Sequence, residues 1–258
     1  MTGGKNMHRR FTSTAFSAAL LCLLVCIWSR PVQAQTSYKY QITPYGFLTG
    51  VHGTIGERGR TASVDASFSD IVHHLNMVAT VYFDARFGRW RVLFDNFYVD
   101  VSNARATPGP LFDSVRVATR MWMVDPEGAY AITQSEDREF DVTAGARIWN
   151  LDNSVNLFRG GLQVDRGAGT RSLADPIIGA RYYSNLTPKI FVLGKADIGG
   201  FSAGASIDWQ AYGQVGYKLK DSIAISAGYR YLAVDNESKN AVFDVHLNGV
   251  VLGLGIRF

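Results

Sequence analysis

The last stretch of the chain, Ala241 to Phe258, reads AVFDVHLNGVVLGLGIRF. Counted back from its end, every second residue is large and apolar: Phe258, Ile256, Leu254, Leu252 and Val250. The positions between them carry mostly small residues. A period of two predicts a β-strand with one apolar face. An aromatic residue at the end of such a face is typical of a strand that closes a bacterial outer-membrane β-barrel, and this is our hypothesis for the whole chain.

The first 34 residues predict a secretory signal peptide. A basic start precedes an apolar run from Ala15 to Trp28, and small residues before and at Ala34 predict cleavage there. A retained membrane anchor is the alternative, but the run is shorter than the roughly 20 residues that a spanning helix needs. The chain therefore divides into a leader, 1–34, and one barrel domain, 35–258.

Removing the leader changes the charge balance. The whole chain has 26 Lys and Arg residues against 22 Asp and Glu residues. Four of the basic residues and none of the acidic ones lie in the leader, so 22 of each sign remain. A neutral domain gives no support to nucleic-acid binding. Cys22 and Cys26 also lie in the leader, so the domain has no disulfide and no cysteine ligand, and we expect no metal and no cofactor.

Alternating apolar residues predict ten strands, with eight as the alternative number. The expected strands are 45–55, 77–87, 90–101, 114–124, 140–150, 175–185, 190–199, 208–219, 222–235 and 241–258. Long connections, above all 56–76 and 151–174, alternate with short ones, as in outer-membrane barrels. In the first of these, Ser69 could cap a short helix. The predicted fold class is all-β, a transmembrane antiparallel up-and-down β-barrel.

Whether the apolar face of the strands points outward or inward distinguishes a membrane barrel from a soluble β-protein. In a soluble β-sandwich or lipocalin-like barrel this face would point inward. Aromatic residues at strand ends, such as Trp90, Trp209 and Phe258, together with charges on the opposite face, favour contact with lipid. The residues expected to face lipid on the first and fourth strands are Tyr45, Phe47, Val51 and Ile55, and Val115, Val117, Met121 and Met123.

The opposite face then lines the lumen and carries charge. In a narrow barrel the side chains largely fill the bore, and buried charges must be paired or hydrated. One interpretation is an internal ion-pair network that plugs the barrel. The other is a narrow polar pore that favours anions, because basic residues outnumber acidic ones. The residues expected in this lumen charge network are Asp84, Arg86, Arg91, Asp95, Arg116, Arg120, Asp141, Arg147, Arg181, Lys195, Asp197 and Arg230.

One candidate catalytic pair is present. Asp244 and His246 share a strand face near the outer rim, and His73 and His74 could lie nearby. Alternating strands bring Asp and His together often by chance, and no Gly-x-Ser-x-Gly motif occurs. We therefore expect a structural or narrow-pore protein and not an enzyme. The alternatives are a lipid-modifying hydrolase at the rim and an adhesin that binds through the two long connections.

Several short segments carry a family resemblance: Leu48–Thr54, Asp175–Tyr182, Asp197–Phe201, Gly228–Leu232 and Gly253–Phe258. They resemble a family of small outer-membrane barrel proteins of Gram-negative bacteria, in the style of the OmpA and OmpW barrels. The resemblance implies the barrel and its location in the bacterial outer membrane, and it brings no substrate or active site. We expect a monomer whose partners are outer-membrane lipids and the barrel-assembly machinery, which would engage the closing strand.

Overall fold

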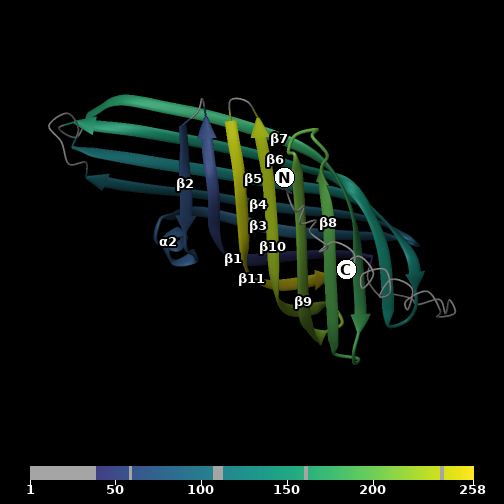
Figure 1. The fold of residues 1–258 in the computed structure, drawn as a ribbon. Helices are drawn as coiled ribbons and strands as arrows, with labels where there is room; N and C mark the ends of the chain where they lie inside the picture. The colour runs from purple at the N-terminus through teal and green to yellow at the C-terminus, as the bar shows by residue number, and fades with distance from the viewer. Residues whose placement is uncertain (1–38, 58–59, 107–112, 160–161, 239–240) are drawn as a thin grey trace, which may run out of the picture.

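The structure is a computed structural model that describes residues 39–258 except 58–59, 107–112, 160–161 and 239–240. The predicted leader lies outside the described residues. Ten antiparallel strands follow one another around a wall, and the last strand pairs with the first (Figure 1). The predicted fold class and the predicted number of ten strands are therefore confirmed.

One short strand and one helix lie in the first connection, in addition to the ten strands of the wall. In chain order the elements are β1 (Tyr40–Glu57), β2 (Arg60–Ala66), α2 (Phe68–His73), β3 (Leu75–Phe87), β4 (Trp90–Ala106), β5 (Ser114–Gln134), β6 (Arg138–Arg159), β7 (Leu162–Asn185), β8 (Ile190–Gly200), β9 (Ile207–Lys220), β10 (Ile223–Ser238) and β11 (Ala241–Arg257).

Pairing between β1 and β11 closes the barrel. It extends from Gln41 opposite Arg257 to Glu57 opposite Ala241. Closure is required because hydrocarbon offers no partner to the N–H and C=O groups of a free strand edge. The short turns, such as Gly88-Arg89 between β3 and β4, lie at the end of the barrel where β1 begins and β11 ends. Short turns mark the periplasmic end of such barrels, so the opposite end faces outward from the cell.

The apolar side of the wall faces outward, as predicted. Ile178, Val215 and Leu254 are 57%, 54% and 41% exposed, whereas Arg147 is fully buried. Arg181 and Arg230 are buried as well. The ionic face is therefore enclosed and the apolar face meets the surroundings, which is the arrangement of a barrel in lipid and the reverse of a soluble one.

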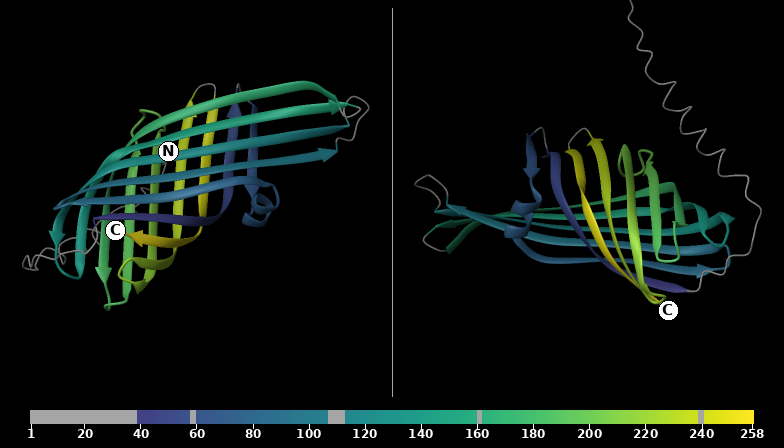
Figure 2. Two further views of the ribbon diagram at one scale, coloured as in Figure 1. Left: turned by 180° about the vertical axis from the view of Figure 1, so that it is seen from behind. Right: turned by 90° about the horizontal axis from the view of Figure 1, so that it is seen from below.

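The predicted loop over 151–174 is wrong. β6 continues to Arg159, β7 begins at Leu162, and the two remain paired, with Asn153 opposite Gly169. β4 also runs past its expected end at Val101 and stays paired with β5 as far as Ala106 opposite Ser114, so four strands extend beyond the wall (Figures 1 and 2). β5 exceeds its expected range only at its other end, where it continues to Gln134. We call the four-strand extension the projecting sheet; it comprises 102–106, 114–120, 150–159 and 162–174. Polar residues occur on both of its faces among scattered apolar ones such as Val117, Leu162 and Val164. The pairing therefore continues where the regular alternation that predicts a strand has stopped.

The predicted connection 56–76 contains β2 and α2. The helix cap is Ser67 and not Ser69: the Ser67 hydroxyl accepts a hydrogen bond from the Asp70 N–H at 3.2 Å, and Asp70 accepts one from the Ser67 N–H at 3.0 Å. The Ser67 hydroxyl also donates to the Asp70 carboxylate at 2.6 Å, and this bond together with the one from the Ser67 N–H holds the pKa of the Asp70 carboxyl below its usual value. The reciprocal bonds fix where the chain turns from β2 toward β3.

The predicted faces of the first and fourth strands are wrong. Phe47, Met121 and Met123 point into the lumen and are buried, and Arg120 points outward. Tyr45 and Val51 share the inward face of β1 with Phe47, whereas the side chain of Ile55 lies outside the described residues. The upper part of the lumen is lined by apolar side chains, so alternation between apolar and polar residues does not reveal which face is which there.

The matched substitutions Val215→Arg and Gln214→Arg test which face of the barrel wall contacts lipid. Val215 faces lipid, whereas its neighbour Gln214 lines a cavity in the lumen. We expect Val215→Arg to lower the free energy of unfolding by about 2–4 kcal/mol, the usual range for an arginine on the lipid face near mid-bilayer. Gln214→Arg should change it much less. Urea titration of the protein folded into lipid vesicles measures both, and equal effects would contradict the assignment of the faces.

Candidate functional site

The lumen is filled in layers. Charged side chains occupy its middle and its periplasmic half, and apolar side chains occupy the half toward the outside. The central ionic cluster consists of Asp95, Asp125, Glu127, Arg147, Lys195, Asp197, Asp208 and Arg230. The lower ionic cluster consists of Asp84, Arg86, Arg91, Glu139, Asp141 and Arg181. All of these residues are buried.

Arg147 is the hub of the central ionic cluster. Its guanidinium reaches Asp125 and Asp197 at 2.9 Å each and Asp208 at 2.6 Å. The four residues come from β6, β5, β8 and β9, so one side chain joins parts of the wall that are far apart in the chain. Arginine suits this role because its planar guanidinium carries five N–H donors and stays charged when buried.

Two further cations complete the layer. Arg230 on β10 reaches Asp95 on β4 at 2.8 Å, and Lys195 on β8 pairs with Glu127 on β5. Because β10 and β4 are well separated in the strand order, the first of these pairs spans the lumen. Paired charges thus reach across the lumen at this height and join strands from its opposite sides.

The lower ionic cluster joins β3, β4, β6 and β7. Arg91 pairs with Asp84 and Glu139, and Arg181 pairs with Asp141 at 2.8 Å and approaches Asp84 to 3.7 Å. Arg86 also pairs with Glu139. Three cations and three carboxylates balance here, which fits the requirement that buried charges be paired.

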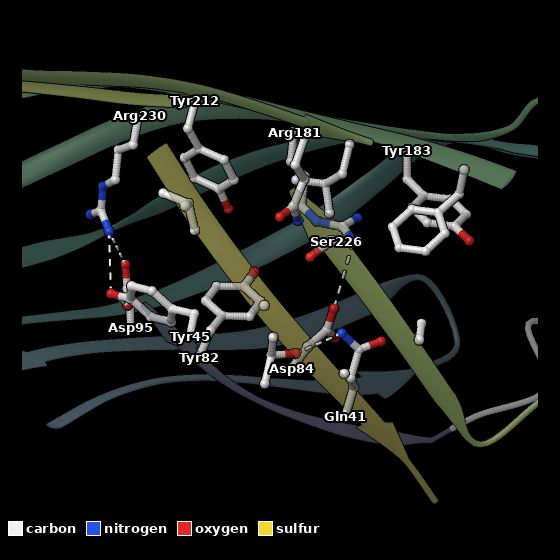
Figure 3. Close-up of a pocket in the computed structure, with 18 of the residues that line it drawn as sticks. Gln41, Tyr45, Tyr82, Asp84, Asp95, Arg181, Tyr183, Tyr212, Ser226 and Arg230 are labelled. Carbon is white, nitrogen blue, oxygen red and sulfur yellow. Dashed lines mark hydrogen bonds and ion pairs between the residues drawn. The ribbon is translucent and has the colours of Figure 1, made fainter. Parts of the chain in front are cut away.

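Beside the lower ionic cluster lies a small cavity of about 60 Å³, enough for a few water molecules. Figure 3 shows the rings of Tyr45, Tyr82 and Tyr212 between the Arg230–Asp95 pair and the Arg181–Asp84 pair. The Tyr45 hydroxyl donates to Asp95 at 2.7 Å. The tyrosine rings separate the charged ends of the cavity. The Tyr82 hydroxyl and the Nε atoms of Arg181 and Arg230 have no hydrogen-bond partner in the described protein, so water in the cavity could bind them.

Above the central ionic cluster the lumen is apolar. This upper apolar cluster consists of Phe47, Phe97, Met121, Met123, Trp149, Leu151, Ala205, Leu232, Val234, Val245 and Leu247. The indole N–H of Trp149 donates to Asp208 at 3.2 Å and so links the two layers. Phe47 and Phe97 pack edge to face, with ring centroids 5.8 Å apart. The lumen of the described barrel thus has an apolar layer over an ionic one.

Ten of the twelve residues expected in the lumen charge network lie in the two ionic clusters, and two do not. Arg116 and Arg120 belong to the projecting sheet and are exposed; Arg120 pairs with Asp100 at 3.0 Å. The prediction was wrong for these two because the face of the fourth strand was reversed. Arg147, Arg181 and Arg230, by contrast, lie where the alternation placed them.

Sequence reasoning missed several acidic partners. Asp125, Glu127, Glu139 and Asp208 take part in the clusters and were not expected there. Met123, Asp125, Glu127 and Ala129 alternate on one face of their strand, and this pattern could have revealed Asp125 and Glu127. Among the described residues nine buried carboxylates face seven buried cations. The excess of basic groups that suggested a preference for anions is therefore absent from the buried part of the described lumen.

The candidate catalytic pair lies on the outer side of the wall. Asp244 and His246 are 3.1 Å apart, and the other ring nitrogen of His246 lies 3.1 Å from the Tyr231 hydroxyl. His73 and His74 bond to carbonyls of their own helix, Ser69 and Asp70, at 2.9 and 2.7 Å. The first-connection histidines therefore do not form hydrogen bonds with this pair. Within the described ranges no three His, Cys, Asp or Glu side chains are grouped so that they could hold a metal ion.

Several solved structures of outer-membrane proteins are similar to this chain. The outer-membrane protease OmpT of Escherichia coli superposes with a TM-score of 0.56 at 9% identity, covering 89% of this chain and 99% of that one. The translocator domain of the autotransporter NalP from Neisseria meningitidis gives 0.48 at 13% identity over 95% of each chain. Ail, the attachment invasion locus protein of Yersinia pestis, gives 0.35 at 13% identity over 86% and 99%. No protein-family profile and no curated protein sequence match this chain.

At such low identity the likeness to OmpT shows the fold and not an activity. The chain is thus an outer-membrane type β-barrel of ten strands, in agreement with its outward apolar face. In the part of the chain that the structure describes, no helix is long and apolar enough to span a membrane.

Replacing Arg147 by methionine should be strongly destabilising. The change removes the shared partner of three buried carboxylates. Asp197 keeps Lys195 at 3.2 Å and Asp125 keeps Arg230 at 4.0 Å, whereas Asp208 loses the one ion-pair partner that it has among the described residues. We expect a loss of about 3–5 kcal/mol in the free energy of unfolding, the usual cost of breaking a buried ion pair on one side. Arg120→Met is the matched control. The Arg120 side chain is exposed, so loss of its ion pair with Asp100 should lower the free energy of unfolding by at most about 1 kcal/mol. Urea unfolding in detergent micelles measures both; a loss for Arg147→Met no greater than the control's would contradict the role of hub.

Proposed function

We propose that the protein is a sealed barrel of the outer membrane that conducts no ions and presents the projecting sheet at the cell surface as a binding surface. The observation that carries the proposal is the central ionic cluster, in which Arg147 joins three carboxylates from three other strands. A pore needs a hydrated path, and a layer of directly paired side chains beneath an apolar layer leaves none. Of the two interpretations that the sequence left open, an ion-pair network that plugs the barrel is therefore favoured over a narrow polar pore.

The projecting sheet supports the second half of the proposal. β7 pairs with β8 only from Ile177 onward, so the part of β7 in the projecting sheet has β6 as its one partner strand among the described residues. Hydrogen bonds between small polar side chains cross the sheet, such as Thr170 to Asp152 at 2.6 Å and Thr119 to Asn153 at 2.9 Å. A long, hydrogen-bonded sheet in water presents a firm and largely polar surface, which suits recognition of another molecule better than a mobile loop does.

Catalysis is not part of the proposal. A general base needs a ring nitrogen free for the substrate's proton. The two ring nitrogens of His246 already lie within hydrogen-bond distance of Asp244 and Tyr231. We interpret the pair as a structural contact at the rim, in the belt where tyrosine and histidine meet lipid headgroups.

Planar-bilayer recording tests the sealed lumen. We expect the purified, folded protein to give no current above that of the protein-free bilayer at moderate voltage. A matched variant, Glu127→Ala with Lys195→Ala, removes one buried pair together and so leaves no orphaned partner in that pair. It should make the bilayer measurably leaky if this layer forms the seal. Regular single-channel steps from the unaltered protein would overturn the proposal.

Trimming the projecting sheet tests the binding surface. The register gives the joining points: Val101 lies opposite Thr119, and Leu151 lies opposite Arg171. Short turns at these two places should leave a barrel that still migrates differently before and after boiling. Bacteria that display the full chain should adhere to an extracellular-matrix surface, and bacteria with the trimmed chain should not. Adhesion that survives the trimming, or that is absent from the full chain, would reject this role. Shortening only 237–242 is the control.

A further inference from the structure

The wall is discontinuous between β1 and β3. β1 pairs with β3 only from Tyr40 to Pro44, opposite Ala85 to Val81. From Val51 upward the same side of β1 pairs with β2 instead. Between these two partners, residues 45–50 have no strand on that side among the described residues, and residues 75–80 of β3 pair with β4 alone. We call this place the β1–β3 gap.

The sequence explains where the gap begins. Pro44 is the last residue of β1 that pairs with β3, and proline has no N–H group to donate. Just above it, the Thr80 hydroxyl donates to the Tyr45 carbonyl, so a side chain takes the place of a backbone donor. Farther up, α2 leads from β2 to β3 and contacts β1, so it bounds the gap at its outer end (Figure 1). The gap is therefore bounded above and below and open at the side.

The gap lies within the height of the apolar band. Leu48 on β1 lies opposite Val250, which in turn lies opposite Tyr229, and all three side chains are exposed on the outer face of the wall. Leu48 and, on β3, Met77 are exposed apolar residues that flank the gap. Hydrocarbon therefore reaches the strands on both sides. An unsatisfied backbone group in hydrocarbon costs several kcal/mol, so a gap at this height calls for a functional explanation.

The lumen behind the gap is apolar as well. Phe47 and Phe97 of the upper apolar cluster come from β1 and β4, the strands on either side of β3 and the gap. Val78 has the same phase as the lumen-facing Tyr82 and lies opposite Val99, yet 51% of its surface is exposed. Because Val78 points inward and is still half exposed, the lumen side of β3 is not covered at this residue. Apolar surface thus continues from the outer wall, past Val78, to the upper apolar cluster.

We propose that the β1–β3 gap is a binding site for the alkyl chain of a membrane amphiphile, which enters sideways from the outer leaflet and packs against the upper apolar cluster. The proposal goes beyond the binding role of the projecting sheet and does not depend on it. The occupant is an alkyl chain because hydrocarbon surrounds the opening and apolar side chains line the path inward. The central ionic cluster forms the floor, since the Arg230–Asp95 pair spans the lumen directly beneath. The site is thus closed at one end and binds the chain without passing it to the periplasm.

Quenching of tryptophan fluorescence by brominated lipid tests the site, because bromine quenches only at short range. Trp149 lies in the upper apolar cluster, whereas Trp90, Trp122 and Trp209 face outward. The full chain carries Trp90→Phe, Trp122→Phe and Trp209→Phe, so that Trp149 reports alone. Trp28→Phe, Cys22→Ser and Cys26→Ser in the predicted leader make the result independent of its removal. The protein is folded into phosphatidylcholine vesicles with or without brominated acyl chains, and we expect the brominated chains to quench Trp149.

Two adjacent residues on opposite faces of β3 allow a charge to be placed inside the gap and, as a control, outside it. In this background Val78→Cys places a thiol on the lumen side of the gap, and Met77→Cys places one on the lipid side at similar exposure, 55% against 51%. After folding, a small trimethylammonium thiol reagent adds a fixed charge at either position, and mass spectrometry verifies the modification. The charge at position 78 should abolish most of the quenching of Trp149, whereas the charge at position 77 should leave it unchanged.

Each outcome decides the proposal. Quenching that the charge at position 78 removes and the charge at position 77 spares supports an alkyl chain in the gap. No quenching before modification means that the chain does not enter, and a gap filled by a polypeptide strand of a partner would then be the better explanation. Quenching that survives the charge at position 78 means that bromine acts through the wall from outside. Either of the last two results overturns the inference.

Discussion

Hydrocarbon gives the backbone no hydrogen-bond partner, and this constraint governs the whole molecule. A chain that crosses the bilayer in strands must satisfy its N–H and C=O groups from strand to strand and must close on itself. Pairing of β1 with β11 along their length provides the closure. The same constraint fixes the side chains: apolar groups point outward at every second position, and whatever cannot face lipid is forced into the lumen. The charged interior is thus a consequence of the wall.

Charges forced inward must then find one another. The two ionic clusters join strands from all parts of the wall, through Arg147 in the middle and Arg181 and Arg91 below. Buried ion pairs do not necessarily stabilise a fold more than apolar packing would. Their geometry is selective, however, because a shift of one strand by two residues would leave several carboxylates without a cation. We infer that the clusters contribute mainly to a unique strand register, and that sealing the lumen follows from the same contacts.

Sequence alone predicted the parts of the fold where lipid and ionic lumen lie on opposite sides of a strand. On β6, Val142 and Ile148 alternate with Asp141 and Arg147, and the prediction was correct. On β1, Phe47 faces an apolar part of the lumen, so both faces look alike. On β5, Pro126 breaks the pairing with β6, which passes from Val124 opposite Ile148 to Glu127 opposite Gly145, but the strand continues through it. Partners across the lumen, such as Asp208 for Arg147, depend on the closed shape and have no local signal.

The closing pair also has a kinetic consequence. Ile42 and Ile256 lie side by side although almost the entire domain separates them along the chain. The other neighbouring wall strands are joined by hairpins or short connections, except β1 and β3, which are joined by the segment that holds β2 and α2. These pairs can form before the chain is complete, whereas the β1–β11 pair must wait until the remaining strands are in order. Contacts between distant residues form slowly. Weak β1–β11 pairing would therefore delay insertion and leave a half-built sheet with two free edges, a species prone to aggregate, even where the finished barrel is stable.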